Sequence, residues 1–218
     1  MKTLRELYQT HSARISQFAQ SFPTEGLQGP LLMDPVAYFR QPTKLLVVGQ
    51  ETGGWHDDYD DIAAQLNAYR KFNLGDNWIG PFWNVTRKVE SNLGIERCSC
   101  AWTNLNRFDQ DGEPPAGAVL TAMPALDFLV REEIQIIRPD ICLFYTNRKY
   151  DHRIEALFPG VQFSDIDGLP SSHFARLRHT ELPALTIRTP HPRTMRMKGW
   201  EEPFLTSLRN LSANDPNA

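Results

Sequence analysis

The sequence predicts an α/β protein, a three-layer α/β/α sandwich with a central, mainly parallel four-stranded sheet. Short apolar runs recur along the chain, and segments with helical spacing of apolar residues stand between them. Strands that alternate with helices form right-handed crossovers, which give a parallel sheet with helices on both faces. The 218 residues are 41% hydrophobic and 22% charged, which is typical of a globular chain with a buried core, and we expect one domain over residues 1–218.

The predicted elements follow one another along the chain. Residues 3–21 have apolar side chains at helical spacing, and Pro23 ends this helix before a loop-like stretch at 22–43. The apolar run Leu45–Val48, which Gly49 ends, predicts a strand buried on both faces. The later elements are strands at 98–105, 141–146 and 184–189, helical or loop segments at 81–93, 118–137 and 150–158, an irregular stretch at 160–183, and a final helix at about 200–212.

Composition and charge restrict the class of protein. No apolar run approaches the roughly 18 residues of a membrane span, and the first six residues lack the apolar segment of a signal peptide, so we expect a cytoplasmic protein without a membrane partner. Cys98, Cys100 and Cys142 fit neither a zinc site nor a disulfide framework, so we expect reduced, buried thiols. Residues 148–198 carry nine Lys and Arg against five Asp and Glu. This excess can mark a polyanion-binding surface, but nine basic residues among fifty-one are also what a solvated face shows by chance.

Polar side chains follow each of the four predicted strands. Ligands of open parallel sheets bind beyond the carboxyl ends of the strands, so these side chains are candidate site residues. Glu51 follows the first strand, Asn104 and Asn147 follow the second and third, and His191, held between two prolines, follows the fourth. A carboxylate, two amides and an imidazole suit acid–base and hydrogen-bond chemistry on a small polar group.

These residue types also have ordinary structural interpretations. Glu51 can complement a helix dipole, and the two amides can cap turns. The segment His56–Asp61 resembles a set of metal ligands, but Asp residues before a helix are typical caps, so we expect no metal. The glycines near Glu51 match neither a dinucleotide-binding nor a phosphate-loop signature, so we expect no cofactor.

The motifs at the strand ends resemble those of the uracil-DNA glycosylase superfamily. Gly49–Gly53 (GQETG) is similar to the GQDPYH and GEAPG motifs, and His191–Met195 (HPRTM) is similar to the HPSPLS or shorter HPS motif. Ile79–Phe82 (IGPF) is similar to the GxPF segment of the iron–sulfur branch, and Trp102–Leu105 (WTNL) is similar to its strand that ends in Asn. The segment Ile136–Ile141 resembles that family's passage from helix to strand, and the motifs keep the family's order over about residues 45–200.

The resemblance implies a monofunctional DNA glycosylase, which flips a pyrimidine nucleotide out of DNA and hydrolyses its N-glycosidic bond. Glu51 would orient or deprotonate water and stabilise an oxocarbenium-like sugar, and His191 would donate to the departing base. Asn104 would bind the pairing edge of the base and Phe82 would stack on its face. Gln50 would offer its backbone N–H group.

Gly53 departs from the family pattern in a way that affects the expected substrate. The common branch has a Tyr there, which crowds the pyrimidine 5-position. A glycine removes that barrier and implies a pocket open to 5-substituted or otherwise enlarged pyrimidines. The alternative is that Trp55 or Trp83 closes the same space and restricts the enzyme to uracil.

The HPRTM motif and the cysteine count also depart from the family pattern. Arg193 replaces the usual Ser, and we expect Arg193, Arg196 and Lys198 to contact DNA phosphates. Met195 is the expected apolar wedge that fills the gap left by a flipped base. The iron–sulfur branch uses four cysteine ligands, and this chain has three cysteines, so no cluster is expected.

Two other functions compete with this interpretation. A non-catalytic protein of the same fold could bind nucleic acid or a free nucleotide, but a carboxylate at Glu51 would weaken its binding of phosphates. A small-molecule hydrolase on a flavodoxin-like sheet would need a nucleophile, and no G-x-S-x-G elbow is present. Ser171–His173 is interpreted as part of a turn, without a catalytic role. We therefore expect a monomeric enzyme whose partner is DNA.

Overall fold

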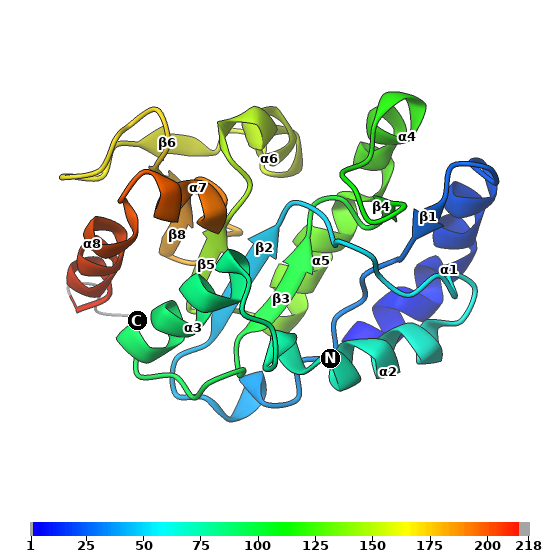
Figure 1. Cartoon of the computed structure of the whole chain (residues 1–218), viewed down its shortest axis with the longest axis horizontal. Helices are drawn as coiled ribbons and strands as arrows, with labels where there is room; N and C mark the ends of the chain where they lie inside the picture. Colours follow the sequence, from blue (N-terminus) through cyan, green and yellow to red (C-terminus); the bar gives the residue numbers. More distant parts are fainter. Residues whose placement is uncertain (1, 214–218) are drawn as a thin grey trace. The chain divides into compact units, whose positions relative to one another are not determined.

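Six strands form the main sheet of the computed structural model, which describes residues 2–213 (Figure 1). In spatial order they are β3 (Ala101–Asn104), β2 (Leu45–Gly49), β5 (Ile141–Phe144), β8 (Leu185–Arg188), β7 (Ala175–Arg178) and β6 (Gln162–Ser164). β2, β5 and β8 are parallel, with Leu45 opposite Ile141 and Ile141 opposite Leu185, whereas β7 and β6 pair in antiparallel fashion. β2 and β5 are buried along their whole length, which explains their continuous apolar sequences.

The α/β class is confirmed, but the predicted number of four strands is wrong. The four predicted strands correspond to β2, β3, β5 and β8, and the sheet gains β7 and β6 beyond β8. Both additional strands lie in the stretch 160–183. β7 alternates buried Ala175 and Leu177 with the less buried Arg176 and Arg178, and β6 is mostly exposed. Alternation over four residues is too short a signal to separate such an edge strand from a loop.

The chain divides into two compact units, each built from three stretches. Unit 1 comprises Met1–Asp34, Gln50–Phe72 and Thr103–Ile137, and unit 2 comprises Pro35–Gly49, Asn73–Trp102 and Arg138–Ala218. The chain therefore leaves unit 2 directly after β2 and again within β3. The expectation of a single domain stays a prediction.

Unit 1 contains the helices α1 (Leu4–Gln20), α2 (Ile62–Phe72) and α5 (Phe128–Ile137), and α1 packs against the other two. A capping box begins α1, because the Glu6 N–H donates to the Thr3 hydroxyl at 3.2 Å and the Thr3 N–H donates to the Glu6 carboxylate at 2.7 Å. A short antiparallel pair, β1 (Leu27–Gln28) and β4 (Asp109–Gln110), completes the unit.

A fully buried ion pair joins the elements of unit 1. Arg107 Nη2 lies 2.6 Å from Glu133 Oε2, and Arg107 Nη1 donates to Glu133 Oε1 at 2.8 Å. The Tyr8 hydroxyl donates to Oε1 at 2.7 Å, and the Thr103 hydroxyl donates to Oε2 at 3.0 Å. Each carboxylate oxygen thus accepts two hydrogen bonds, which offsets the cost of burying both charges. The pair fixes the end of β3, where Asn104 stands.

The helix predicted over 118–137 is interrupted. α4 (Gly117–Ala122) is followed by a 3₁₀ turn, η3 (Met123–Leu126), before α5 begins. Pro124 lacks the N–H group that would continue the α-helical hydrogen bonds across this point. The helical spacing of apolar residues continues through the break, so the sequence predicts a single helix. Leu120, one of these apolar residues, is nevertheless exposed.

In unit 2, α3 (Pro81–Asn92) packs against α7 (Pro192–Met197) and α8 (Glu201–Ala213). α6 (Asp151–Leu157) follows the 3₁₀ turn η4 (Arg148–Tyr150), and two further 3₁₀ turns are η1 (Tyr38–Arg40) and η2 (Asn73–Gly75). The six residues of α7 are too few for a periodic signal, so the sequence does not predict this helix. Within residues 2–213, every helix is too short or too polar to cross a bilayer.

Candidate functional site

The segment after β2 carries Gln50 and Glu51 in unit 1. Gln50 is buried, and its carbonyl accepts the N–H of Asn106 at 2.7 Å. The side-chain amide of Asn106 donates to Glu51 Oε2 at 3.0 Å. Asn106 is fully buried, whereas Glu51 is half-buried and reaches solvent. Asn106 therefore orients the carboxylate from the inside of unit 1.

Asp109 organises the glycine turn that follows Glu51. Its Oδ2 accepts the N–H groups of Gly54 and Trp55 at 3.1 and 3.0 Å and the hydroxyl of Thr52, and its Oδ1 accepts the Gly112 N–H at 2.9 Å. The Asp109 side chain is fully buried. A buried carboxylate that accepts several N–H groups makes this turn rigid. Asp109 is not among the residues predicted from the sequence, because it lies beyond the residues that directly follow a predicted strand.

Gly53 is exposed, and its surroundings have room for a side chain. A Cβ atom there would meet only the Gly112 carbonyl oxygen, at 3.7 Å, which is an ordinary contact distance. Trp55, one of the aromatic residues considered for closing this space, donates through Nε1 to Gln65 Oε1 at 2.9 Å. Its ring also packs edge-on against Phe72 at 5.5 Å. These contacts hold Trp55 against α2.

Asn104, the residue expected to bind the base edge, ends β3 and is 1% exposed. It belongs to unit 1 together with Gln50, Glu51 and Gly53. The other predicted site residues, Phe82 and the segment from His191 onward, belong to unit 2.

His191 lies after β8 and is the N-cap residue of α7. Its Nδ1 accepts the N–H of Arg193 at 3.2 Å, and its backbone N–H donates to Asn147 Oδ1 at 3.1 Å. Burial, together with the positive charges of Arg193 and Lys149, lowers the pKa of His191 to about 4. The imidazole is therefore neutral at pH 7. Because Nδ1 is an acceptor, the single ring proton is on Nε2, which is a hydrogen-bond donor.

Phe82 lies beside His191 within unit 2. The two ring centroids are 5.9 Å apart with an interplanar angle of 39°. The Phe82 ring also packs against Tyr145 at 5.5 Å and Trp83 at 4.9 Å. Pro81 is the first residue of α3 and follows the N-cap residue Gly80. Phe82 therefore lies in the first turn of this helix. Trp83 is buried and packs edge-on against Trp102 at 5.0 Å, which holds it in the core.

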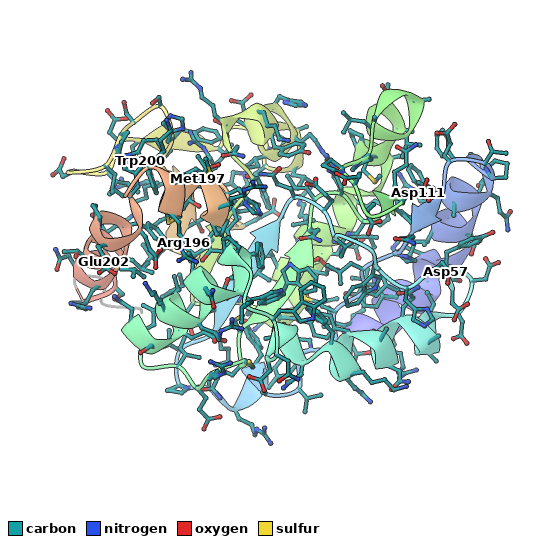
Figure 2. The ribbon with its side chains drawn as sticks, viewed as in Figure 1. Asp57, Asp111, Arg196, Met197, Trp200 and Glu202 are labelled. Atoms are coloured by element: carbon teal, nitrogen blue, oxygen red, sulfur yellow. The ribbon has the colours of Figure 1, made fainter. Side chains whose placement is uncertain are left out.

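The structure contradicts the expectation that Met195 is the wedge. Met195 is fully buried, because α7 turns Pro192 and Met195 inward while its remaining side chains are less buried. Met197, two residues further along, is 73% exposed (Figure 2). Arg193 and Lys198 are exposed, as phosphate contacts require, and Arg196 Nε lies 3.4 Å from Glu201 Oε2.

The remaining sequence features have structural explanations. Asp61 caps α2, since its Oδ1 accepts the Ala64 N–H at 2.9 Å. Ligand atoms of His56, Asp57 and Asp58 lie within 4.8 Å of one another, but all three side chains are exposed. The three cysteines are unpaired; Cys100 and Cys142 are buried and Cys98 is half-buried. Burial raises the pKa of the Cys98 thiol to about 11, and it raises the pKa values of the other two as well, so none is a reactive thiolate at pH 7.

No model of a known protein family matches this chain. A search of curated proteins also found no match.

Proposed function

We propose that this chain is a DNA glycosylase of the uracil-DNA glycosylase superfamily, with the three-layer α/β/α arrangement of that superfamily. It hydrolyses the N-glycosidic bond of a flipped-out uracil-like, 5-substituted or otherwise enlarged pyrimidine. The observation that carries the proposal is the state of His191. A neutral imidazole whose Nε2–H is a donor, beside the aromatic ring of Phe82, suits a planar base that leaves as an anion.

The chemistry requires charge stabilisation on both sides of the breaking bond. When the C1′–N1 bond breaks, its electron pair goes to the base, and the sugar becomes oxocarbenium-like. A donor at the base oxygen stabilises the anion, and a carboxylate near the sugar stabilises the cation. Water then adds to C1′ and gives its proton to the carboxylate, and the base takes a proton from solvent. In this proposal His191 is the donor and Glu51 is the carboxylate.

The contact between Asn106 and Glu51 supports a catalytic role for Glu51. The fully buried amide of Asn106 donates to the Glu51 carboxylate at 3.0 Å. This hydrogen bond fixes the orientation of the carboxylate, which remains partly accessible to solvent. A carboxylate in this position would repel phosphates, so a protein that only binds nucleic acid gains nothing from it. Asn106 is a positioning residue that acts through Glu51.

The test is single-turnover excision from oligonucleotides that carry uracil, mismatched thymine or bulky 5-substituted pyrimidines, with alkaline cleavage of the abasic product. Glu51→Gln should lower the rate by about 10²–10⁴ and leave DNA binding within about threefold. Asp57→Asn, which alters an exposed carboxylate of the same segment, is the matched control and should keep the parental rate.

A second variant separates positioning from folding. Asn106→Ala should lower the rate in the parental protein and have no further effect in the Glu51→Gln background, because it acts through that carboxylate. Binding of these oligonucleotides without excision of any base would refute the proposal and favour a non-catalytic binder.

The DNA contacts are tested by salt dependence. We propose that Arg193, Arg196 and Lys198 contact phosphates; their joint replacement by Gln should weaken binding to all sequences alike. The slope of log affinity against log salt concentration should fall by roughly one for each lost contact. An unchanged slope in the triple variant would mean that these side chains form only a solvated face.

A further inference from the structure

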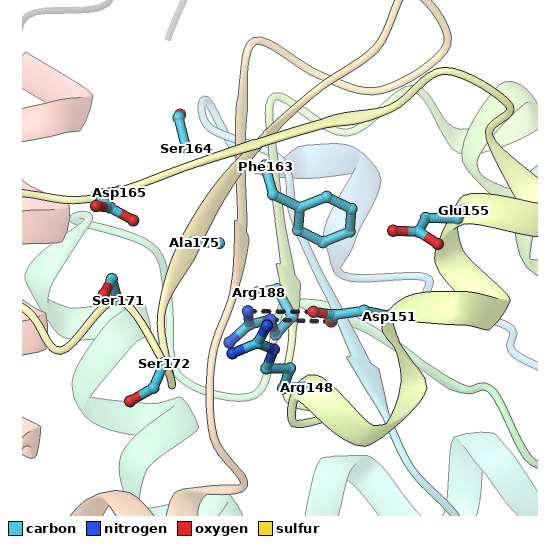
Figure 3. Close-up of a pocket in the computed structure, with 10 residues that line it drawn as sticks. All are labelled: Arg148, Asp151, Glu155, Phe163, Ser164, Asp165, Ser171, Ser172, Ala175 and Arg188. Carbon is cyan, nitrogen blue, oxygen red and sulfur yellow. Dashed lines mark hydrogen bonds and ion pairs between the residues drawn. The ribbon is translucent and has the colours of Figure 1, made fainter.

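Unit 2 contains a pocket of about 410 Å³ that the proposed glycosylase chemistry does not use. It lies among α6, β6, the end of β8 and residues 171–172, and two arginines are among its lining residues (Figure 3). One of these arginines is almost completely buried and only partly paired.

Arg188, the last residue of β8, is 3% exposed. Its Nε lies 3.0 Å from Asp151 Oδ1, and its Nη2 donates to Asp151 Oδ2 at 3.2 Å. Its Nη1 is buried and has no hydrogen-bond acceptor among residues 2–213. A buried guanidinium donor without an acceptor is unfavourable, so this edge of Arg188 is suited to an anionic oxygen supplied by a ligand.

Arg148 adds a second positive charge to the same pocket. Both arginines line the pocket, where their side chains overlap in the view of Figure 3, and the Arg148 side chain is exposed. Burial lowers the pKa of Arg188, and the charge of Arg148 acts in the same direction, whereas Asp151 opposes both. Asp151 supplies one negative charge that acts on both guanidinium groups, so the pair keeps an excess positive charge that an anionic ligand can offset. The hydroxyl groups of Ser171 and Ser172 line the pocket as further donors.

The opposite side of the pocket restricts the kind of anion. Glu155 and Asp165, both exposed, also line it, so it would repel a continuous polyanion such as a DNA backbone. Carboxylates accept hydrogen bonds from hydroxyl or amino groups, and the half-buried Phe163 ring offers an apolar face. These features match a small molecule with one phosphate group, a hydroxyl or N–H donor and an apolar ring face.

We propose that this pocket binds a small phosphate monoester of the mononucleotide class, with the phosphate held by Arg148 and Arg188. Binding involves no covalent step and does not depend on glycosylase activity. The site is also connected to the supports of His191. Arg148 directly follows Asn147, which accepts the His191 N–H, and Arg188 is followed by Thr189, whose carbonyl accepts the Asn147 N–H at 3.1 Å.

Calorimetric titration of the full chain with dTMP, thymidine and inorganic phosphate tests the proposal. We expect dTMP to bind at least about tenfold more tightly than thymidine, because thymidine lacks the charge-assisted hydrogen bonds. Arg148→Gln should weaken dTMP binding by about tenfold or more. Arg209→Gln removes the same charge from an exposed site on α8 and should leave the affinity unchanged.

A second variant examines the unused edge of Arg188. Arg188→Lys keeps a positive charge near Asp151 but removes Nη1, and it should weaken dTMP binding by a similar factor if it folds. Perturbation of the backbone amide signals of Asn147 and Thr189 on addition of dTMP should localise the ligand. Unaltered dTMP affinity in a folded Arg148→Gln variant would overturn the proposal. So would undetectable dTMP binding, or tighter Arg148-dependent binding of a 5′-phosphorylated oligothymidylate than of dTMP.

Discussion

His191→Asn tests whether burial keeps the imidazole of His191 neutral. The pKa of this histidine falls from the ordinary 6.5 to about 4, mainly because burial disfavours the charged form and also because Arg193 and Lys149 are positive. At 1.36 kcal/mol per pKa unit, the full effect is about 3 kcal/mol. The unfolded chain takes up the proton at higher pH than the folded chain does. Stability from the neutral imidazole is therefore complete above about pH 6.5 and is lost as the pH falls towards 4.

The assay compares urea unfolding of the parental protein and His191→Asn across this pH range. Between pH 7 and pH 4.5, the parental protein should lose about 2 kcal/mol of unfolding free energy more than the variant. The other five histidines are present in both proteins, so their contributions cancel. An NMR titration of the His191 ring should give a pKa near 4, and the excision rate should show no inflection near pH 6.5 that depends on His191. A measured pKa near 6.5, or a difference in stability that does not change with pH, would refute the reasoning.

The buried ion pair, the open side of Gly53 and the two methionines of α7 give three further predictions. Glu133→Gln leaves Arg107 buried without a negative partner and should lower the free energy of unfolding by about 3–5 kcal/mol in urea titrations. Glu132→Gln, which breaks a half-exposed pair with Lys2, should cost less than about 1 kcal/mol, and equal losses would contradict this account. Gly53→Tyr should abolish excision of 5-substituted pyrimidines and spare excision of uracil; if the parental protein acts on uracil only, or both activities fall together, the pocket is not open there. Met197→Ala should slow excision from duplex DNA more than from single strands, whereas Met195→Ala should instead lower the free energy of unfolding by about 2–5 kcal/mol; the reverse pattern would restore Met195 as the wedge.

The main sheet shows which parts of the fold can be predicted from the local sequence. β2 and β5 are buried on both faces, so each is a short apolar run that sequence alone identifies. β7 and β6 lie at the edge, and their three or four residues carry too little periodicity to be distinguished from loops. The predicted helix 118–137 kept its apolar spacing through η3, and the missing N–H of Pro124 decided where it breaks.

The candidate site divides in a similar way. The positions of Glu51 and His191 shortly after strands are visible in the sequence, because each residue follows a short apolar run. The hydrogen bond from Asn106 to Glu51 was not predicted, although Asn106 follows the same strand as Asn104, because an amide near a turn is usually a cap. The burial of Met195 could not be predicted either, because it depends on α7 being a helix and on its packing against α3 and α8.

The sequence by itself determined the α/β class, the strands of the sheet core and the residues that follow them, because these depend on apolar runs and their neighbours along the chain. Only the tertiary structure decided the neutral state of His191, the orientation of Glu51 by Asn106, the fixing of the glycine turn by Asp109 and the pairing of Arg188 with Asp151. Asn106 and Glu51 are separated by 55 positions in the chain, and Arg188 and Asp151 by 37. Desolvation and hydrogen bonding act through space, so a property that depends on them is set by neighbours that folding brings together.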